Sequence, residues 1–318
     1  MRALVVREPG PAENLEPAEL ARPAAGAGSV VVRVGAVGVN PVDATNRADP
    51  SWAGIEPPYV VGYEFAGWIE EVGPGATRFV RGDAVWGMCP VRGARWGAYA
   101  EFVEVEADWV GPRPAALDVI EAAAMPLTGS TALQLLDRLA LRPGDSVLVH
   151  GASGGVGRLF VQLARMQGVR VAASSSRTRH PLLRDLGVEI VIDREEGDVV
   201  AAAVRQVGGL LDAVADCAGH GLLPASLVGV REGGSAGSIV ELCGDFEEAI
   251  DRNLRLHGVL ARPERRTLDR LGEAVERGPL RPVVDTVVEP DAIVRAHRRL
   301  ETGRGAGKVV LRMAAATG

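Results

Sequence analysis

The pattern of apolar and polar positions changes about a third of the way along the chain. Up to about residue 125, short apolar runs are separated by glycine and proline, as is typical of strands in a compact, partly closed β domain. The strands predicted in this part are residues 29–34, 67–72, 84–87, 98–105 and 108–110. From Leu117 onward, apolar residues recur at helical spacing instead. The sequence therefore predicts a β-rich first domain followed by a part of different architecture.

Strand-like and helical segments then alternate from Asp145 to about Ala261. Six apolar runs with helical stretches between them indicate a parallel sheet with helices on both faces. These runs are residues 146–150, 169–173, 189–192, 211–216, 238–242 and 255–259. Beyond them we expect a helix over 267–277, a strand over 283–288, a helix over 290–301 and a closing strand over 308–312. The predicted fold class is thus α/β. A doubly wound parallel sheet occupies 126–264, and a β-rich domain over 1–125 is completed by residues of about 265–318.

A glycine cluster follows the first strand of the predicted parallel sheet. The strand ends in Gly151-Ala152-Ser153-Gly154-Gly155-Val156-Gly157, and an amphipathic segment over 158–168 comes next. Glycines let a backbone approach a pyrophosphate closely, and a helix N-terminus offers free N–H groups and a positive dipole end. The pattern therefore favours a Rossmann-type dinucleotide site, with Ser153, Gly154, Gly155, Val156 and Gly157 as contacts. The alternative is a turn with a purely structural role.

The end of the second predicted strand bears on which dinucleotide is bound. NAD-binding folds place an acid there, about 20 residues after the glycines. This chain instead has Ser174-Ser175-Ser176-Arg177-Thr178-Arg179, with Arg194 just after the third strand. Hydroxyl and guanidinium groups bind a 2′-phosphate that an acid would repel. We therefore expect NADP(H), although any single arginine in this arginine-rich chain is equally explained as an exposed solubilising residue.

Composition narrows the function classes. Of 318 residues, 47% are hydrophobic and 24% charged, the balance of an ordinary globular protein. A net charge of −6 argues against nucleic acid as a partner. The three cysteines fit a reducing compartment, and neither a signal peptide nor an apolar run of membrane-spanning length is recognised. We expect a cytoplasmic protein without a membrane partner.

Short motifs in a fixed order extend over nearly the whole chain. They are Gly38-Val39-Asn40-Pro41-Val42-Asp43, Gly62-Tyr63-Glu64-Phe65-Ala66-Gly67, Gly82-Asp83-Ala84-Val85-Trp86-Gly87, Gly97-Ala98-Tyr99-Ala100-Glu101, Gly129-Ser130-Thr131-Ala132, the glycine cluster and Gly307-Lys308-Val309-Val310-Leu311. With these motifs the chain resembles the zinc-independent quinone oxidoreductase branch of the medium-chain dehydrogenase/reductase superfamily.

The resemblance implies a GroES-like fold for the β-rich domain, NADP(H) as cofactor and a small quinone or an enone or enoyl compound as substrate. It also implies a homodimer paired along the strand over 255–259. Further cofactor contacts implied in the same way are Thr45, Thr131, Gly219, Leu242, Cys243 and Gly244.

Departures from the zinc-dependent relatives define the branch. Those relatives have a cysteine at the position of Asn40 and a histidine at the position of Tyr63, and both bind zinc. Their third zinc ligand falls near the position of Thr128. Amide, phenol and hydroxyl groups are not the thiolate, imidazole and carboxylate ligands that zinc prefers. The four-cysteine lobe that binds structural zinc in those relatives is also missing, since Cys89 stands alone. No metal is expected.

Without a metal, hydrogen-bond donors must stabilise the negative charge that develops on a carbonyl oxygen. Tyr63 is the candidate donor, with a half-buried core tyrosine as the alternative reading, and Asn40 is expected to orient substrate or cofactor. Lys308, the only lysine, lies in the closing strand and is set aside as an acid. The expected substrate-binding side chains are Trp52, Tyr59, Trp96 and Thr128.

Three functions follow from this interpretation. The first is NADPH-dependent hydride transfer to a quinone or an activated C=C. The second is an enoyl reductase, or another tailoring enzyme, of polyketide or secondary metabolism. The third, from a different class, is an NADP(H)-binding protein without redox turnover.

Overall fold

The computed structural model describes residues 1–303, 305 and 307–313. The chain divides into two compact units. The β-rich unit comprises Met1–Ser130, Arg262–Gly278 and Pro282–Gly318, and the α/β unit comprises Thr131–Ala261 and Pro279–Arg281. The sequence places the corresponding boundaries at 125/126 and 264/265. Within the described residues, no helix combines the length and apolar character needed to cross a membrane.

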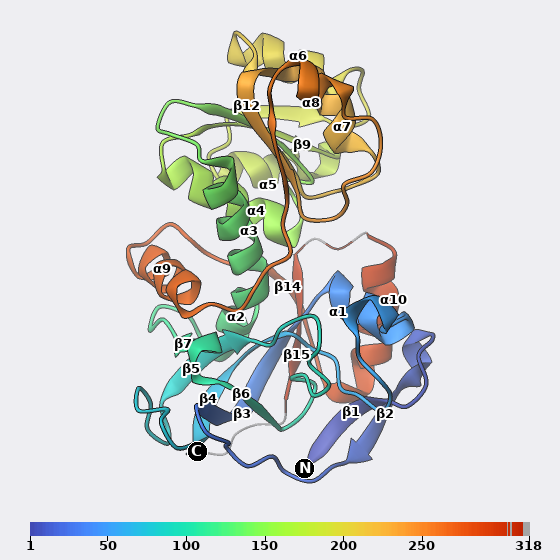
Figure 1. Cartoon of the computed structure of the whole chain (residues 1–318), viewed down its shortest axis with the longest axis vertical. Coiled ribbons are helices and arrows are strands. Elements are labelled where there is room, and N and C mark those ends of the chain that lie inside the picture. The colour runs from blue at the N-terminus through green and yellow to red at the C-terminus, as the bar shows by residue number, and fades with distance from the viewer. Residues whose placement is uncertain (304, 306, 314–318) are drawn as a thin grey trace. The chain divides into compact units, whose positions relative to one another are not determined.

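The β-rich unit is built on a seven-stranded sheet (Figure 1). Its strands lie in the order β14 (Val284–Val288), β15 (Lys308–Arg312), β3 (Ser29–Val39), β4 (Glu64–Val72), β5 (Ala84–Met88) and β7 (Val110–Pro112), and β6 (Phe102–Glu106) also pairs with β3. A separate antiparallel pair is formed by β1 (Arg2–Val6) and β2 (Leu15–Glu19). The helices of this part are α1 (Pro41–Ala48), α2 (Val119–Ala123), α3 (Pro126–Leu139), α9 (Arg265–Glu276) and α10 (Ile293–Glu301), and α3 runs on past Ser130.

The closing strand β15 lies inside this sheet, between β14 and β3. It pairs antiparallel with β3, so that Val309 faces Val39 and Val310 faces Gly38. The prediction that the last strand returns to the first domain is confirmed. Gly38 has no room for a side chain, because a Cβ there would lie 2.3 Å from a carboxylate oxygen of Glu64. This pairing brings Lys308 beside the start of α1.

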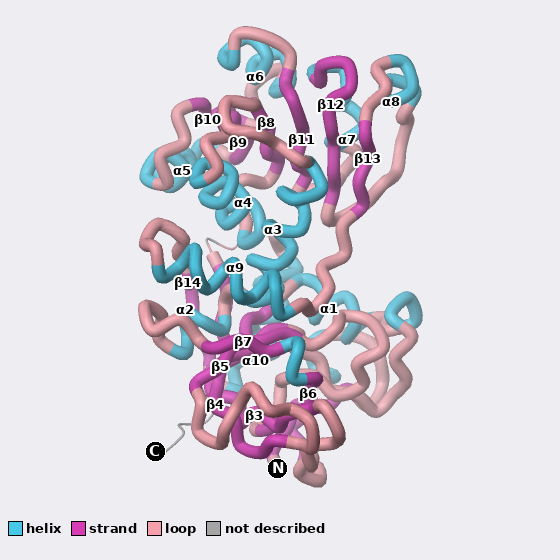
Figure 2. Tube along the Cα trace, turned by 60° about the vertical axis from the view of Figure 1, so that its left-hand side comes forward, coloured by secondary structure: helices cyan, strands magenta, loops and turns pink. Residues whose placement is uncertain are grey.

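The α/β unit holds a six-stranded sheet whose neighbouring strands are all parallel (Figure 2). The order is β10 (Ile190–Asp193), β9 (Arg170–Ser175), β8 (Ser146–His150), β11 (Leu211–Asp216), β12 (Val230–Ser238) and β13 (Arg255–Gly258). The connections carry α4 (Gly155–Met166), α5 (His180–Asp185), α6 (Val199–Val207), α7 (Leu222–Ser226) and α8 (Glu247–Asp251). This is the doubly wound order, which reverses between β8 and β11. Ligands of such folds bind at the carboxyl ends of the strands at this reversal.

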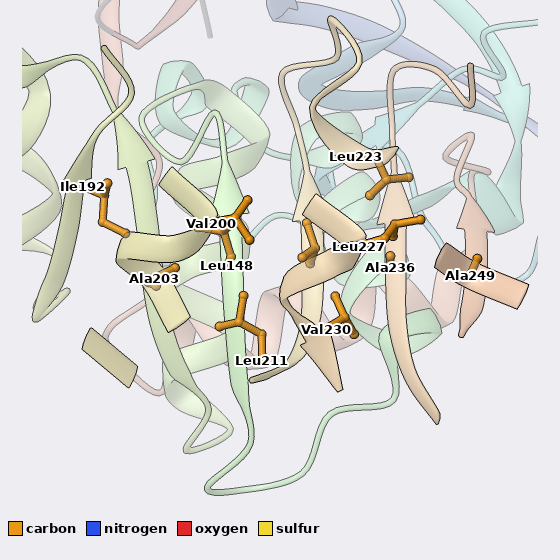
Figure 3. Packing of buried hydrophobic residues seen from close by; sticks show 12 residues of the cluster. Leu148, Ile192, Val200, Ala203, Leu211, Leu223, Leu227, Val230, Ala236 and Ala249 are labelled. Atoms are coloured by element: carbon orange, nitrogen blue, oxygen red, sulfur yellow. The ribbon is translucent and has the colours of Figure 1, made fainter. Parts of the chain in front are cut away.

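One face of this sheet packs against α6, α7 and α8 (Figure 3). Leu148 of β8 and Ile192 of β10 lie on this face with Val200 and Ala203 of α6, and Ala172 of β9 belongs to the same buried cluster. Alternate residues of a strand point to the same face, so this set is fixed by the strand register. The predicted fold class is confirmed.

The predicted strand over 238–242 is wrong. The strand is β12, Val230–Ser238, which ends where the prediction begins. Its sequence, Val-Arg-Glu-Gly-Gly-Ser-Ala-Gly-Ser, has too little apolar character to be recognised. Small residues are needed there, since a Cβ on Gly237 would lie 2.7 Å from Leu135. Because α3 packs closely on β12, the strand is built of small residues and lacks the apolar pattern by which strands are recognised.

Candidate functional site

The glycine cluster forms a tight turn from β8 into α4. Gly151 has a φ of +67°, and Gly154 is the N-cap of α4. A Cβ on Gly157 would lie 2.3 Å from the carbonyl oxygen of Gly151, so only glycine lets the helix pack this closely on the turn. Gly154 is exposed, and Ser153, Gly155 and Val156 are partly exposed. Because the first N–H groups of a helix have no partners within it, this turn fits a dinucleotide pyrophosphate.

His150, the last residue of β8, organises the buried edge beside the turn. Ser226 donates its hydroxyl hydrogen to the carbonyl of Leu222, so it accepts from His150 Nε2 at 2.8 Å. His150 Nδ1 then accepts from the hydroxyl of Ser174 at 3.0 Å. Burial lowers the pKa of His150, which keeps the ring neutral. The imidazole therefore has a structural role in this unit.

This arrangement changes the expectation for the three serines at the end of β9. The donor of Ser174 is engaged with His150, and Ser174 is buried. Ser175 is also buried and donates to the carbonyl of Ser176 at 3.3 Å. Ser176 is partly exposed and lies 3.3 Å from the hydroxyl of Thr178. Ser176 is therefore the one of these three serines that a ligand can reach. Ser174 was expected to bind the phosphate, but its hydroxyl hydrogen is engaged with His150.

No acid stands at the end of β9 itself, but acids from the neighbouring strand and its following turn lie at this edge. The end of β10 lies beside the end of β9, with Asp193 opposite Ser175. Arg177 donates from Nε to Asp193 at 3.1 Å and also pairs with Glu196, and Arg194 lies 3.6 Å from Glu195. The sequence separation of 16 residues between Arg177 and Asp193 conceals this contact. Arg179 lies in the same turn, partly exposed.

Asp216, the last residue of β11, was not recognised from the sequence. One of its buried oxygens accepts from the backbone N–H groups of Ala218 and Gly219, each at 2.9 Å, and the other accepts from Ser238 at 3.1 Å. Asp216 therefore joins the loop that follows β11 to the last residue of β12. The sequence carried a signal, since an acid ends an apolar run and a glycine follows three residues later. In the structure this glycine, Gly219, has a φ of +77°.

The remaining expected cofactor residues lie in both units. Leu242, Cys243 and Gly244 are exposed in the loop after β12, at the carboxyl edge of the parallel sheet. Thr131 is buried in α3. Thr45 is exposed on α1, where its hydroxyl donates to the carbonyl of Pro41 at 3.2 Å.

In the β-rich unit, Lys308 forms the centre of a buried polar cluster. Its ammonium donates to Asn40 Oδ1 at 2.6 Å and to the carbonyl of Val39 at 2.9 Å, and it pairs with Glu64 at 2.6 Å. The other oxygen of Glu64 accepts from the backbone N–H of Leu127 at 2.8 Å. On sequence alone Lys308 was set aside as an acid. Its being the only lysine in a chain with 34 arginines was nevertheless a usable signal.

This cluster changes the role expected of Asn40. Its amide donates to the carbonyl of Gly38 at 3.1 Å and to Glu64 at 2.9 Å, while Oδ1 accepts from Lys308. Both N–H groups of a carboxamide are then in use. Asn40, which is 3% exposed, anchors the start of α1 and has no free donor for a substrate or cofactor.

A chain of hydrogen bonds runs from Asp43 to α10. Arginine has no acceptor, so Arg47 donates to His297 Nδ1 at 3.3 Å. His297 Nε2 therefore carries the hydrogen and donates to Tyr99 at 3.0 Å, and Tyr99 donates to Asp43 at 3.1 Å. Burial and the charge of Arg47 lower the pKa of His297 to about 3, and burial raises the pKa of Asp43 to about 7.

Tyr63 and Tyr59 are both completely buried but differ in hydrogen bonding. Asn46 donates to the hydroxyl oxygen of Tyr63 at 2.7 Å, which leaves the hydrogen of that hydroxyl for another acceptor. Burial raises the pKa of Tyr63, so the phenol stays protonated. Tyr59 donates to the carbonyl of Asn46 at 2.8 Å. Tyr59 thus supports the end of α1 and does not line a cleft as expected.

The two tryptophans expected at the substrate are exposed. Trp52 is 37% exposed and Trp96 is 46% exposed. Arg92 lies over the ring of Trp52 at 5.7 Å, and Arg95 lies over that of Trp96 at 4.9 Å.

The side chains at the zinc positions of the related dehydrogenases do not fit a zinc ion. The amide of Asn40 is engaged, and Thr128 is buried with its hydroxyl donating to the carbonyl of Ala124 at 2.8 Å. Tyr63 offers a protonated phenol. In the described part of the chain, no three His, Cys, Asp or Glu side chains come together as a possible metal site.

Known proteins resemble both units. Residues 26–115 match the alcohol dehydrogenase GroES-like domain family, and residues 186–311 match the zinc-binding dehydrogenase family. The 2-methylene-furan-3-one reductase of Solanum lycopersicum is 32% identical over 89% of this chain and 71% of its own length. The chain belongs to the medium-chain dehydrogenase/reductase superfamily. Within it, the chain falls in the zinc-independent quinone oxidoreductase branch, and it is an oxidoreductase of the type that uses a nicotinamide cofactor.

Solved structures of this superfamily agree with the fold. The quinone oxidoreductase of Coxiella burnetii is 29% identical, with a TM-score of 0.89 over 98% of this chain and 99% of that chain. A structure described as an NAD-dependent alcohol dehydrogenase is 31% identical, with a TM-score of 0.91 over 99% of this chain and 100% of that chain.

Proposed function

We propose that this medium-chain dehydrogenase/reductase is an NADPH-dependent enzyme that reduces quinones or C=C bonds conjugated to a carbonyl. The turn from Gly151 to Gly157 carries this proposal, because it offers helix N–H groups to a pyrophosphate at the sheet edge where such folds bind nucleotides. The bound nicotinamide supplies the hydride. The chain must bind that cofactor, hold the acceptor and stabilise the negative charge that hydride transfer produces.

Residues of the α/β unit are assigned to the cofactor. Gly154–Gly157 would bind the pyrophosphate, and Gly219 and the loop with Leu242, Cys243 and Gly244 would flank the nicotinamide half. Ser176, Arg177, Arg179 and Arg194 would bind the 2′-phosphate of the adenosine ribose. Guanidinium groups at this position favour NADPH, because they form charge-assisted hydrogen bonds with the phosphate.

Residues of the β-rich unit are assigned to the acceptor. Tyr63 would donate its hydroxyl hydrogen to the carbonyl oxygen, since Asn46 already occupies the oxygen of that hydroxyl. The phenol is buried, so this contact requires its neighbours to move. Lys308 and Glu64 hold the loop from which α1 begins, and the exposed indoles of Trp52 and Trp96 offer flat apolar surface. The tomato relative named above is a reductase of an enone, which supports this substrate class.

The proposal is tested by following NADPH oxidation with a quinone, an enone and an enoyl thioester in parallel. Turnover on the quinone or the enone is expected. Preference for the thioester would instead indicate an enoyl reductase of polyketide or secondary metabolism. Tight cofactor binding without turnover on any acceptor would indicate a binding protein. Fluorescence titration should show NADPH bound at least about tenfold more tightly than NADH, a difference of about 1.4 kcal/mol.

We also propose a homodimer in the cytoplasm. The strand β13 is an edge of the parallel sheet, and exposed apolar side chains at Leu256, Leu260 and Val240 accompany it. An unpaired edge favours pairing with a second copy, which satisfies its backbone groups. Light scattering should give a dimer mass at micromolar concentration, and a monomer mass would contradict this assignment.

A further inference from the structure

Arg177 is held by two carboxylates at the edge where the adenosine ribose is expected. It begins the turn after β9, and Asp193 is the last residue of β10. The two strand ends are fixed side by side, because Arg194 donates its backbone N–H to the carbonyl of Ser175 at 2.9 Å. Nε of Arg177 faces Asp193 and Nη2 faces Glu196. The guanidinium is therefore paired with two carboxylates of the same chain.

We propose that Asp193 and Glu196 compete with the 2′-phosphate of NADPH for Arg177 and thereby set the preference of the enzyme between NADPH and NADH. This inference rests on the proposed nicotinamide site at this edge. A guanidinium binds phosphate through two parallel N–H bonds, and here an Nε hydrogen and an Nη2 hydrogen are both occupied by carboxylates. The same carboxylates also repel a phosphate that approaches Arg177. The ribose of NADH carries no such charge, and its hydroxyl can donate to an acid at this position.

The two carboxylates differ in how firmly they are placed. The side chain of Asp193 is 9% exposed and also accepts the backbone N–H of Glu195 at 3.1 Å, so it is fixed to the turn that follows β10. The side chain of Glu196 is 66% exposed, and the described contacts give it Arg177 as its partner. Glu196 can therefore rotate away when a phosphate binds, whereas Asp193 stays. Removing the charge of Glu196 leaves the turn intact and is the cleaner test.

The experiment uses the full chain with Glu196→Gln and Asp193→Asn. Glu189→Gln is the matched control, because this substitution changes the net charge by the same amount. Glu189 is exposed and lies just before Ile190, at the opposite end of β10 from Asp193. Dissociation constants are measured by calorimetry for NADPH and NADH and for the fragments 2′,5′-ADP and 5′-AMP. We expect Glu196→Gln to bind NADPH and 2′,5′-ADP about threefold to fivefold more tightly, the range of one exposed ion pair. The dissociation constants for NADH and 5′-AMP should change less than twofold. Adding Arg177→Gln to Glu196→Gln should abolish the tighter binding of NADPH and 2′,5′-ADP.

The outcomes separate this inference from the proposed function. Unchanged binding of 2′,5′-ADP in both carboxylate variants, or an equal gain in Glu189→Gln, would overturn the inference. Equal affinity of the unmodified protein for NADPH and NADH would overturn only the assignment of NADPH. A gain in 2′,5′-ADP binding by Glu196→Gln would support the inference even then. If Asp193→Asn fails to fold, Glu196→Gln alone decides.

Discussion

The ammonium of Lys308 donates to the side-chain oxygen of Asn40 at 2.6 Å, across 268 residues of sequence. The pairing of β15 with β3 makes this contact, and Glu64 completes it from β4. The charges are buried but fully hydrogen-bonded, which is the condition under which a buried ion pair is tolerated. The two residues that precede α1, Val39 and Asn40, are thus held by a side chain of β15.

Lys308→Met should destabilise the β-rich unit by about 3–5 kcal/mol, because it leaves Glu64 as an unpaired buried charge. All five tryptophans lie between residues 52 and 109, so tryptophan fluorescence during urea unfolding reports on this unit. The double variant Lys308→Met with Glu64→Gln should lose less unfolding free energy than the sum of the losses in the two single variants. A loss below about 1 kcal/mol for Lys308→Met would show that the pair contributes no more than an exposed one.

Tyr63→Phe should lower kcat on an enone by on the order of a hundredfold, because one donor to a developing oxyanion contributes about 2.7–4 kcal/mol. The dissociation constant for NADPH should hardly change, since the contact is made in the transition state. Tyr59→Phe is the matched control, because Tyr59 is equally buried and donates to the backbone. If Tyr63→Phe stays within about threefold of the unmodified enzyme on both a quinone and an enone, Tyr63 is not the donor.

His297 should make the β-rich unit less stable in acid. Its pKa is about 3 in the folded protein, so between that value and about 6.5 the unfolded chain binds a proton that the folded chain does not. Stability contributed by neutral His297 is therefore lost as the pH falls below about 6.5, at about 1.4 kcal/mol per unit of pH. The raised pKa of Asp43 acts with the opposite sign, because folded Asp43 binds the extra proton below pH 7.

The His297 contribution is isolated by comparing unfolding free energies of the unmodified protein and His297→Gln from pH 4 to pH 7. Their difference should shrink as the pH falls, because the variant lacks the histidine that must stay neutral. A difference that does not vary with pH would show that His297 titrates alike in both states.

The protein should contain no stoichiometric zinc, and chelators should leave its activity intact. Asn40 and Thr128 have their side chains engaged in hydrogen bonds, and Tyr63 is held protonated by burial. Elemental analysis and an assay after dialysis against a chelator test this. One zinc per chain, lost together with activity, would contradict it.

Local sequence patterns predict the elements well where a segment has its own apolar periodicity. The runs over 146–150, 211–216 and 308–312 coincide with β8, β11 and β15. The pattern fails for β12, where packing demands glycine and serine. It fails also at the helix predicted from Leu117, which the structure divides into α2 and α3 ahead of Pro126.

The glycine turn between β8 and α4 follows from sequence for the same reason, since its four glycines lie within seven residues of one another and their geometry is local. The contacts of Lys308 with Asn40, of Tyr63 with Asn46 and of Arg177 with Asp193 join different elements. Each depends on strand order or helix placement, which no local pattern contains. The sequence therefore indicates which residue types a site can draw on. The pairing of strands and helices decides which of these side chains are already engaged with other parts of the chain.

The place of β15 inside the first sheet has a consequence for synthesis on the ribosome. All six strands of the parallel sheet lie within residues 131–261, so the α/β unit has nearly all of its chain before residues 308–312 are synthesised. The β-rich unit begins earlier in the sequence, but the part of β3 from Ala36 to Val39 lacks its β15 partner until residues 308–312 emerge. We expect the α/β unit to mature first, while the β-rich unit stays incomplete and accessible to chaperones until β15 has been synthesised.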